Sequence, residues 1–412
     1  NSMYCIGLMS KIKWSSNEDT IEKTRSVNDV ADSEKPIVIF DCEVFENLFV
    51  ICWKYKGVKM DPVVMENPSP DEVRELYSNF RLVGYNNRSY DNHILYARAN
   101  GYNNYQLYML SQRIINGEKD AKDAKFGAAY NLSYTDIYDF LSAGNKMSLK
   151  KWEINLKIHH QEVGIPWDKP VPKEKWPLVE EYCQNDVIAT EKVWEANESD
   201  WLARCILADI SGLTVNDTTN QCTTRLIVGE DRNPQGEFVY TDLSSIFPGY
   251  EFNKYGIDKS RYNEGAKIVA GKSIYLGEDP GEGGYVYAEP GIHSNVGLLD
   301  VASMHPHSLI ALNMFGKRYT KIFSELVEAR VMIKHGDFDG AGKLLDGKLK
   351  PYLKDKSDAK KLANALKTAI NSVYGLTSAK FPNKLRDPRN EDNIVAKYGA
   401  LFMITLKNEV QK

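Results

Sequence analysis

Two acidic residues inside an apolar strand sequence constrain this chain more than any other feature. The run from Pro36 to Trp53, PIVIFDCEVFENLFVICW, is apolar and rich in β-branched residues, which is typical of a buried strand. It contains Asp41 and Glu43, and side chains at i and i+2 point to the same face of a strand. Neighbouring carboxylates resist burial unless a cation lies between them. The pattern predicts a divalent metal site on one face, while the opposite face takes Phe40, Cys42 and Val44.

Later carboxylates are candidates for the remaining ligands of this site. Asp91 lies in YNNRSYDNHIL, and Asp186 lies in EYCQND, where Tyr182 precedes it by one helical turn. Two metal ions about 4 Å apart need several hard oxygen ligands from different elements, and together they promote phosphodiester hydrolysis. Taken singly, the same residues also fit a surface acidic pair, a turn and a core aromatic.

The composition is that of a soluble globular protein. The 412 residues are 42% hydrophobic and 26% charged, and their number predicts two or three domains. The chain has no apolar run long enough for a membrane helix, and it does not start with a secretion signal. Its six cysteines form no CxxC pair, which is typical of reduced thiols. We therefore expect no membrane partner and a cytoplasmic location (the host cytoplasm if the protein is viral).

Charge is distributed unevenly along the chain. Residues 317–412 contain 20 Lys/Arg and 11 Asp/Glu, which leaves 32 basic and 45 acidic residues elsewhere. An acidic N-terminal part favours metal sites there, and a basic C-terminal part favours a surface that binds a polyanion. The alternative interpretation of the basic part is a set of solvated, lysine-rich helices.

The hydrophobic patterns predict an α/β unit from 36 to 210. IVIFDCEVF and NLFVICWKY are expected to form a hairpin, RLVGYN a further strand, and SPDEVRELYSN a capped helix. The stretch from Trp176 to Leu207 has helical periodicity over enough residues for two helices or one kinked helix. A turn-rich connection at 229–293 leads to NVGLLDVAS, which we expect to be a buried strand, and then to helices near 320–337 and 357–374.

Three of these motifs resemble the proofreading 3′–5′ exonuclease domain of DNA polymerases. The family patterns D-x-E, N-x-x-(F/Y)-D and Y-x-x-x-D stand here, in family order, as DCE, NRSYD and YCQND. The resemblance implies an RNase H-like fold in which Asp41, Glu43 and Asp186 hold the metals. Asp91 would act largely through water on the metal, and Tyr182 would orient the attacking water. It also implies DNA-binding residues, for which the candidates are Asn87, Tyr90 and either Lys150 or Lys151.

A second constellation lies in the basic part of the chain. Asp300 directly follows the expected strand, where ligands often bind, although an aspartate there can also cap a helix. In KTAINSVYG, helical spacing places Lys367, Asn371 and Tyr374 on one face. The other stripe of that helix is expected to be core, with Leu362, Leu366, Ile370 and Val373. Two basic residues at i and i+4 on the preceding helix are expected to face the same cleft, namely Arg330 and Lys334.

With these residues the chain resembles a bacteriophage-type family B DNA polymerase over 36–412. The family's motif A, D-x-x-S-L-Y-P-S, stands as DVASMHPHS, and its motif B, K-x-x-x-N-S-x-Y-G, is matched completely by KTAINSVYG. The resemblance implies that Asp300 is a ligand of both polymerase metals. It also implies that the incoming triphosphate is neutralised by Arg330, Lys334 and Lys367. Asn371, Tyr374 and Gly375 would line the nascent base pair. His305 stands where the family usually has the tyrosine that excludes a 2′-hydroxyl.

The resemblance also implies a domain order. It gives an N-terminal extension (1–35), the exonuclease domain (36–210), a connection (211–295), palm with motif A (296–319), helical-hairpin fingers with motif B (320–378) and a palm helix (379–412). The pattern D-T-D-S of the family's third motif is absent from these residues, as is a thumb. We therefore expect little nucleotide incorporation by this polypeptide without a further polymerase segment.

The expected function is that of a DNA-directed DNA polymerase with 3′–5′ exonuclease activity and two Mg²⁺ or Mn²⁺ ions per active site. Its expected partners are a primer-template, a single-stranded 3′ end, deoxynucleoside triphosphates (dNTPs), and a C-terminal polymerase half or processivity factor. The alternatives are a stand-alone exonuclease with a basic DNA-gripping region, one half of a split polymerase, and a non-enzymatic DNA-binding subunit.

Overall fold

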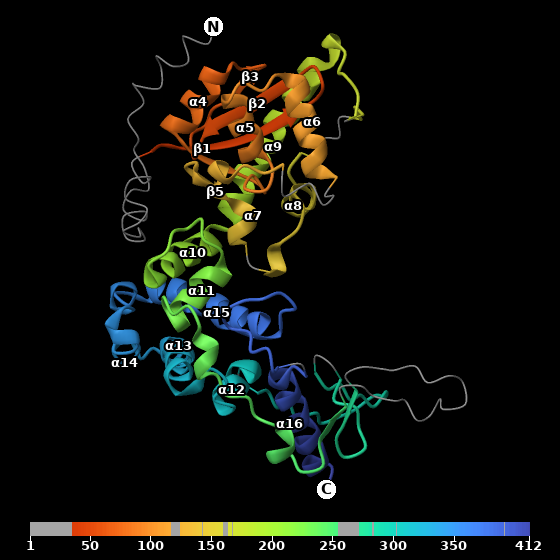
Figure 1. Cartoon of the computed structure of the whole chain (residues 1–412), viewed down its shortest axis with the longest axis vertical. Coiled ribbons are helices and arrows are strands. Elements are labelled where there is room, and N and C mark those ends of the chain that lie inside the picture. Colours follow the sequence, from red (N-terminus) through yellow and green to blue (C-terminus); the bar gives the residue numbers. More distant parts are fainter. Residues whose placement is uncertain are drawn as a thin grey trace, which may run out of the picture. The chain divides into compact units, whose positions relative to one another are not determined.

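A computed structural model describes the protein over most of its length (Figure 1). The described residues are 35–116, 124–141, 143–159, 164–166, 168–253, 272–281, 284–301, 303–390 and 392–412. They divide after Thr218 into two compact units. The N-terminal extension expected at 1–35 lies outside the described residues except for its last position.

The first unit is built on one five-stranded mixed sheet, which confirms the α/β class (Figure 1). The strand order is β3-β2-β1-β4-β5. β1 pairs with β2 in the predicted antiparallel hairpin, whereas β4 runs parallel to both β1 and β5. The strands are β1 (Ile37–Val44), β2 (Phe49–Tyr55), β3 (Val63–Glu66), β4 (Arg81–Gly84) and β5 (Tyr134–Asp136).

Local sequence signals set the ends of several helices in this unit. The predicted capped helix begins at Pro70, directly after its N-cap residue Ser69, whose hydroxyl forms a reciprocal capping box with the Glu72 carboxylate. The long helical stretch breaks at Asn197 into two helices, α9 and α10. The helices are α4 (Pro70–Asn79), α5 (Asp91–Ala99), α6 (Asn104–Ile115), α7 (Ile137–Phe140), α8 (Leu149–Leu156), α9 (Trp176–Ala196) and α10 (Glu198–Ser211).

The sheet has a hydrophobic core on each face. Side chains from α4, α5 and α6 pack on one face, and side chains from α7, α8 and α9 pack on the other. Within β1 the alternation is the predicted one, because Phe40, Cys42 and Val44 belong to the first core and Ile39 belongs to the second. The acidic pair of β1 thus lies on the face that α9 covers.

The second unit is mainly helical. Its predicted helix pair is present as α13 and α15, which pack against each other, and the apolar stripe of α15 is buried as expected. No helix in the described part of either unit has both the length and the apolar character needed to cross a membrane. The elements are α11 (Thr219–Val228), β6 (Glu251–Asn253), β7 (Lys272–Ile274), α12 (Met304–Ala311), α13 (Gly316–His335), α14 (Phe338–Ala341), α15 (Lys356–Ser378) and α16 (Ile394–Val410).

The prediction of a buried strand at NVGLLDVAS is wrong. The structure has no strand within 284–301, and Leu298 and Leu299 are 91% and 76% exposed. A strand needs backbone hydrogen bonds from a neighbour, and no described strand pairs with this segment. Asp300 is consequently exposed and does not stand at a strand end.

Candidate metal centre

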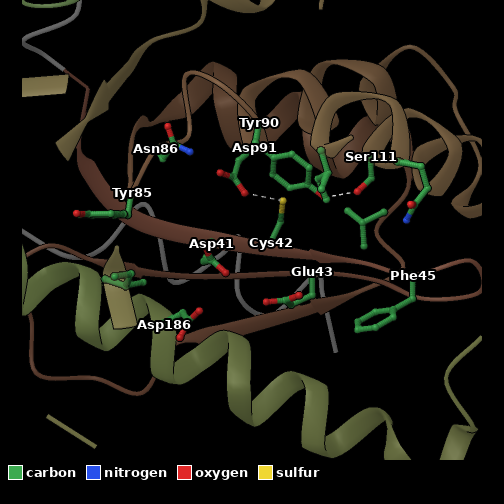
Figure 2. A pocket seen from close by; sticks show the side chains of 14 residues that line it. Asp41, Cys42, Glu43, Phe45, Tyr85, Asn86, Tyr90, Asp91, Ser111 and Asp186 are labelled. Atoms are coloured by element: carbon green, nitrogen blue, oxygen red, sulfur yellow. Dashed lines mark hydrogen bonds between the residues drawn. The ribbon is translucent and has the colours of Figure 1, made fainter. Parts of the chain in front are cut away.

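Strand β1 and helix α9 bring three carboxylates together in the first unit. On β1, the pairing with β4 covers only Ile37–Ile39, so Asp41 and Glu43 lie beyond the last residue of β1 that pairs with β4. α9 packs against β1 and β2 and supplies Asp186. One ligand atom from each of the three residues can be chosen so that all lie within 4.8 Å of one another. Figure 2 shows the three side chains converging on one area beside β1.

The electrostatics of this cluster favour a bound cation. Burial raises the pKa of Asp41, and the charges of Asp91, Asp186 and Glu43 raise it further. Burial and then Asp186 raise the pKa of Glu43 to about 8, and burial raises the pKa of Asp186 to about 6. Each carboxylate therefore resists ionisation next to the others, and a metal ion relieves that repulsion. The acidic triad can hold a metal ion.

The donor atoms fit a hard cation. Carboxylate oxygens are the ligands that Mg²⁺ and Mn²⁺ prefer, whereas thiolates select softer metals. Two thiols lie nearby: the Cys42 Sγ donates to Asp91 Oδ1 at 3.0 Å, and the Cys183 Sγ lies 3.9 Å from Asp41 Oδ2. Burial, as the largest cause, raises the pKa of both thiols, which keeps them protonated and leaves the oxygens as the ligand set.

Of the two candidate lysines, only Lys150 points to the acidic triad. Its Nζ lies 3.2 Å from Asp186 Oδ1 and 4.1 Å from the centroid of the Tyr182 ring. Lys151, one position further along α8, is exposed, and its backbone N–H is capped by Ser148. Burial and the charge of Asp186 raise the pKa of Tyr182, so its hydroxyl stays protonated.

Asp91 lies beside the triad rather than within it. It is the first residue of α5, and its carboxylate accepts the hydrogen bond from Cys42. It lines the same pocket as Asp41, Glu43 and Asp186, and burial raises its pKa to about 6. Its charge is nevertheless the strongest acidic influence on Asp41. Asp91 thus adds negative charge next to the triad.

The two predicted DNA-binding residues before Asp91 differ in accessibility. Asn87 is fully buried and its side-chain amide donates to Asn92 Oδ1 at 3.0 Å, so it does not reach the pocket in this conformation. A Cβ on Gly84 would lie 2.8 Å from the Asn87 Cβ, which explains the glycine at the end of β4. Tyr90 lines the pocket, and its hydroxyl is hydrogen bonded to Ser111 at 2.7 Å (Figure 2).

The pocket contains residues that sequence reasoning missed. Its volume is about 360 Å³, and its additional lining residues include Phe45, Tyr85, Asn86, Ser111 and Leu149. Tyr85 and Asn86 directly follow β4, so the position of the strand end was a usable signal for them. Outside the pocket lining, no local signal pointed to Glu153, which is fully buried, lies 3.9 Å from the Lys150 Nζ and accepts a hydrogen bond from the Asn185 amide.

The second unit places only some of its predicted residues together. The ring of His305 stacks on Tyr374 with centroids 4.1 Å apart, and the Tyr374 hydroxyl accepts a hydrogen bond from Asn393. On α15 the predicted residues Lys367, Asn371 and Gly375 are exposed, and α13 carries Arg330 and Lys334. Among the described residues, Asp300 belongs to no cluster of three possible metal ligands.

The first unit therefore holds a carboxylate triad with a lysine and a tyrosine hydroxyl beside it, open to a pocket. This arrangement can bind a divalent cation and place a phosphate and a water near it. Comparisons with protein families and with curated proteins find no match for this chain. The functional assignment consequently depends on the residues of the site.

Proposed function

We propose that the first unit is a metal-dependent 3′–5′ DNA exonuclease. The observation that carries this proposal is the triad of Asp41, Glu43 and Asp186, which shares a pocket with Tyr90 and Asp91 and has Lys150 against Asp186. The three motifs that supply all of these residues except Lys150 also stand in the order of proofreading exonucleases. An RNase H-like arrangement of the mixed sheet is part of the same proposal.

Each residue of the site has a separate role in the proposed phosphodiester hydrolysis. Asp41, Glu43 and Asp186 would hold two Mg²⁺ or Mn²⁺ ions, which when bound supply Lewis-acid stabilisation of the attacking and leaving oxygens. Tyr182 orients the attacking water through its protonated hydroxyl. Lys150 brings a positive charge to the edge of the acidic site, where it favours the scissile phosphate. Tyr90 and the pocket wall contact the terminal nucleotide.

We infer further that the second unit belongs to a DNA polymerase of family B. The complete motif B on α15, the basic surplus of residues 317–412 and the His305–Tyr374 stack support this inference. Arg330, Lys334 and Lys367 would then neutralise the triphosphate of an incoming dNTP. A stand-alone exonuclease whose basic part only grips DNA is the alternative, and the intact motif B favours the polymerase.

The exonuclease proposal is tested by the double variant Asp41→Ala/Glu43→Ala. With Mg²⁺ or Mn²⁺ and a 5′-labelled single-stranded oligonucleotide, the wild type is expected to shorten the strand from its 3′ end and the variant to lose this activity. Calorimetric titration should show that the variant also loses the Mn²⁺ binding of the wild type.

The matched control is Asp61→Ala/Glu75→Ala, which removes two exposed carboxylates from the same unit. It should keep both the activity and the Mn²⁺ binding of the wild type. Wild-type hydrolysis by the purified Asp41→Ala/Glu43→Ala variant would refute the assignment.

A further inference from the structure

Helix α6 exposes a largely apolar stripe that the proposed chemistry does not use. Tyr105, Met109 and Ile115 are 55%, 44% and 56% exposed. Tyr105 and Met109 are four residues apart, and Gln112 continues the same helical face one turn later. Ile115 adjoins this face at the end of the helix. We call these four residues the α6 stripe.

One end of the α6 stripe lies at the pocket of the metal centre. Gln112 and Ile115 line that pocket together with Ser111, whose hydroxyl is hydrogen bonded to Tyr90. The stripe extends from there along the helix to Tyr105, a distance of about 15 Å for an α-helix of this length. A molecule held in the pocket can therefore continue onto the stripe.

The charge of α6 suits a polyanion. The helix, NYQLYMLSQRII, contains no carboxylate, and its single charged residue is Arg113, which is exposed. This is notable in a part of the chain where acidic residues outnumber basic ones. Aromatic and flexible apolar side chains next to a pocket for a phosphodiester are what stacked bases of a single strand require.

We propose that the α6 stripe binds the bases of a single-stranded nucleic acid whose 3′-terminal nucleotide occupies the pocket. This proposal rests on the proposed exonuclease function and adds the path of the strand. Tyr105 and Met109 contact nucleotides upstream of the terminal one, and Gln112 and Ile115 lie where the strand enters the pocket. The stripe raises the affinity for longer strands and has no part in hydrolysis itself.

The test compares a substrate that fills only the pocket with strands that reach the stripe. The first is the p-nitrophenyl ester of thymidine 5′-phosphate, and the others are a fluorescent tri- and dodecathymidylate bound in Ca²⁺. For Tyr105→Ala/Met109→Ala we expect wild-type hydrolysis of the ester. The Kd for the dodecamer should rise by about five- to 150-fold, the factor that stacking of one base supplies.

Two further variants separate stacking from general damage. Tyr105→Phe keeps the ring and should bind the dodecamer like the wild type. Ile188→Ala removes an exposed apolar side chain from α9 and should also have no effect. Equal dodecamer affinity of the wild type and Tyr105→Ala/Met109→Ala would overturn the α6 stripe as a strand path.

The outcome for the proposed function is read separately. If the wild type hydrolyses the ester and shortens oligonucleotides, the exonuclease proposal stands whatever the stripe variants do. If the wild type does neither, the exonuclease proposal fails and the strand path is overturned with it.

Discussion

Lys150 is placed where its charge counters part of the negative charge of the metal centre. Its ammonium contacts Asp186 and lies over the ring of Tyr182. Lys150→Ala should lower the kcat of the proposed exonuclease activity about a hundredfold, the usual loss when a preorganised electrostatic contact to the reacting phosphate is removed. Single-turnover digestion of single-stranded DNA measures this effect.

The neighbouring lysine supplies the control for this prediction. Lys151→Ala removes the same charge from an exposed position on the same helix, and its kcat should stay close to that of the wild type. Equal losses of kcat in both variants would show that turnover depends only on the general positive charge of α8 and not on the position of Lys150.

Glu43 gives the metal-free protein a characteristic pH dependence. Its pKa is raised to about 8, first by burial and then by Asp186. The folded state holds the Glu43 proton more tightly than the unfolded state. The stabilisation from this proton is therefore complete below the pKa of Glu43 in the unfolded state, and it is lost as the pH rises through the pKa of Glu43 in the folded state. In EDTA, wild-type protein should therefore lose stability relative to Glu43→Gln between about pH 5 and about pH 8.

Urea unfolding at several pH values measures the difference, which should reach a few kcal/mol at the alkaline end. Glu75→Gln, an exposed substitution on α4, should follow the wild type at every pH. Mn²⁺ should restore stability to the wild type at the alkaline end. Parallel curves for the wild type and Glu43→Gln would contradict the raised pKa.

At the scale of elements, the turn between β4 and α5 depends on a carboxylate from β5. Asp136 is buried, and its oxygens accept the backbone N–H groups of Asn86 at 2.9 Å, Arg88 at 3.0 Å and Tyr138 at 2.9 Å. This turn leads into Tyr90 and Asp91, so the position of both in the pocket depends on these hydrogen bonds.

Asp136→Ala should lower the free energy of unfolding by about 3 kcal/mol, because three backbone N–H groups lose their shared acceptor. Hydrogen exchange of the amides at 86–91 should accelerate, and the KM for a single-stranded substrate should rise as Tyr90 loses its fixed position. Asp136→Asn keeps one acceptor oxygen and should fall between the wild type and Asp136→Ala. Unchanged exchange at 86–91 in Asp136→Ala would refute this role.

At the scale of the whole molecule, the proposed activities belong to different units. Lys367 is exposed on α15 in the second unit, whereas the acidic triad belongs to the first. Lys367→Ala should therefore weaken dNTP binding about tenfold or more, as expected for one lost contact to a triphosphate, and leave exonuclease turnover unchanged. Fluorescent dNTP titration and digestion of single-stranded DNA measure the two effects.

Lys360→Ala is the matched control, since Lys360 is exposed earlier on the same helix and outside motif B. It should change neither property. If Lys367→Ala and Lys360→Ala bind dNTPs equally, the basic part of the chain only grips DNA, as the alternative function requires.

Patterns that act over a few residues were predictable from the sequence. The alternation in β1, the β1–β2 hairpin, the capping box of α4 and the apolar stripe of α15 all follow from side-chain periodicity and local hydrogen bonds. The strand expected at NVGLLDVAS failed because its apolar residues alone do not make a strand, which also needs a neighbouring strand to pair with.

The sequence by itself therefore determined which residues share a face, where α4 begins, and which acidic motifs were worth connecting. Only the tertiary structure decided that β1 and α9 meet, placing Asp41 and Cys183 in contact although 142 residues separate them. It also selected Lys150 over Lys151 and buried Asn87. The physical reason is that packing the helices on both faces of the sheet fixes the direction of each side chain, whereas periodicity assigns it only to a face.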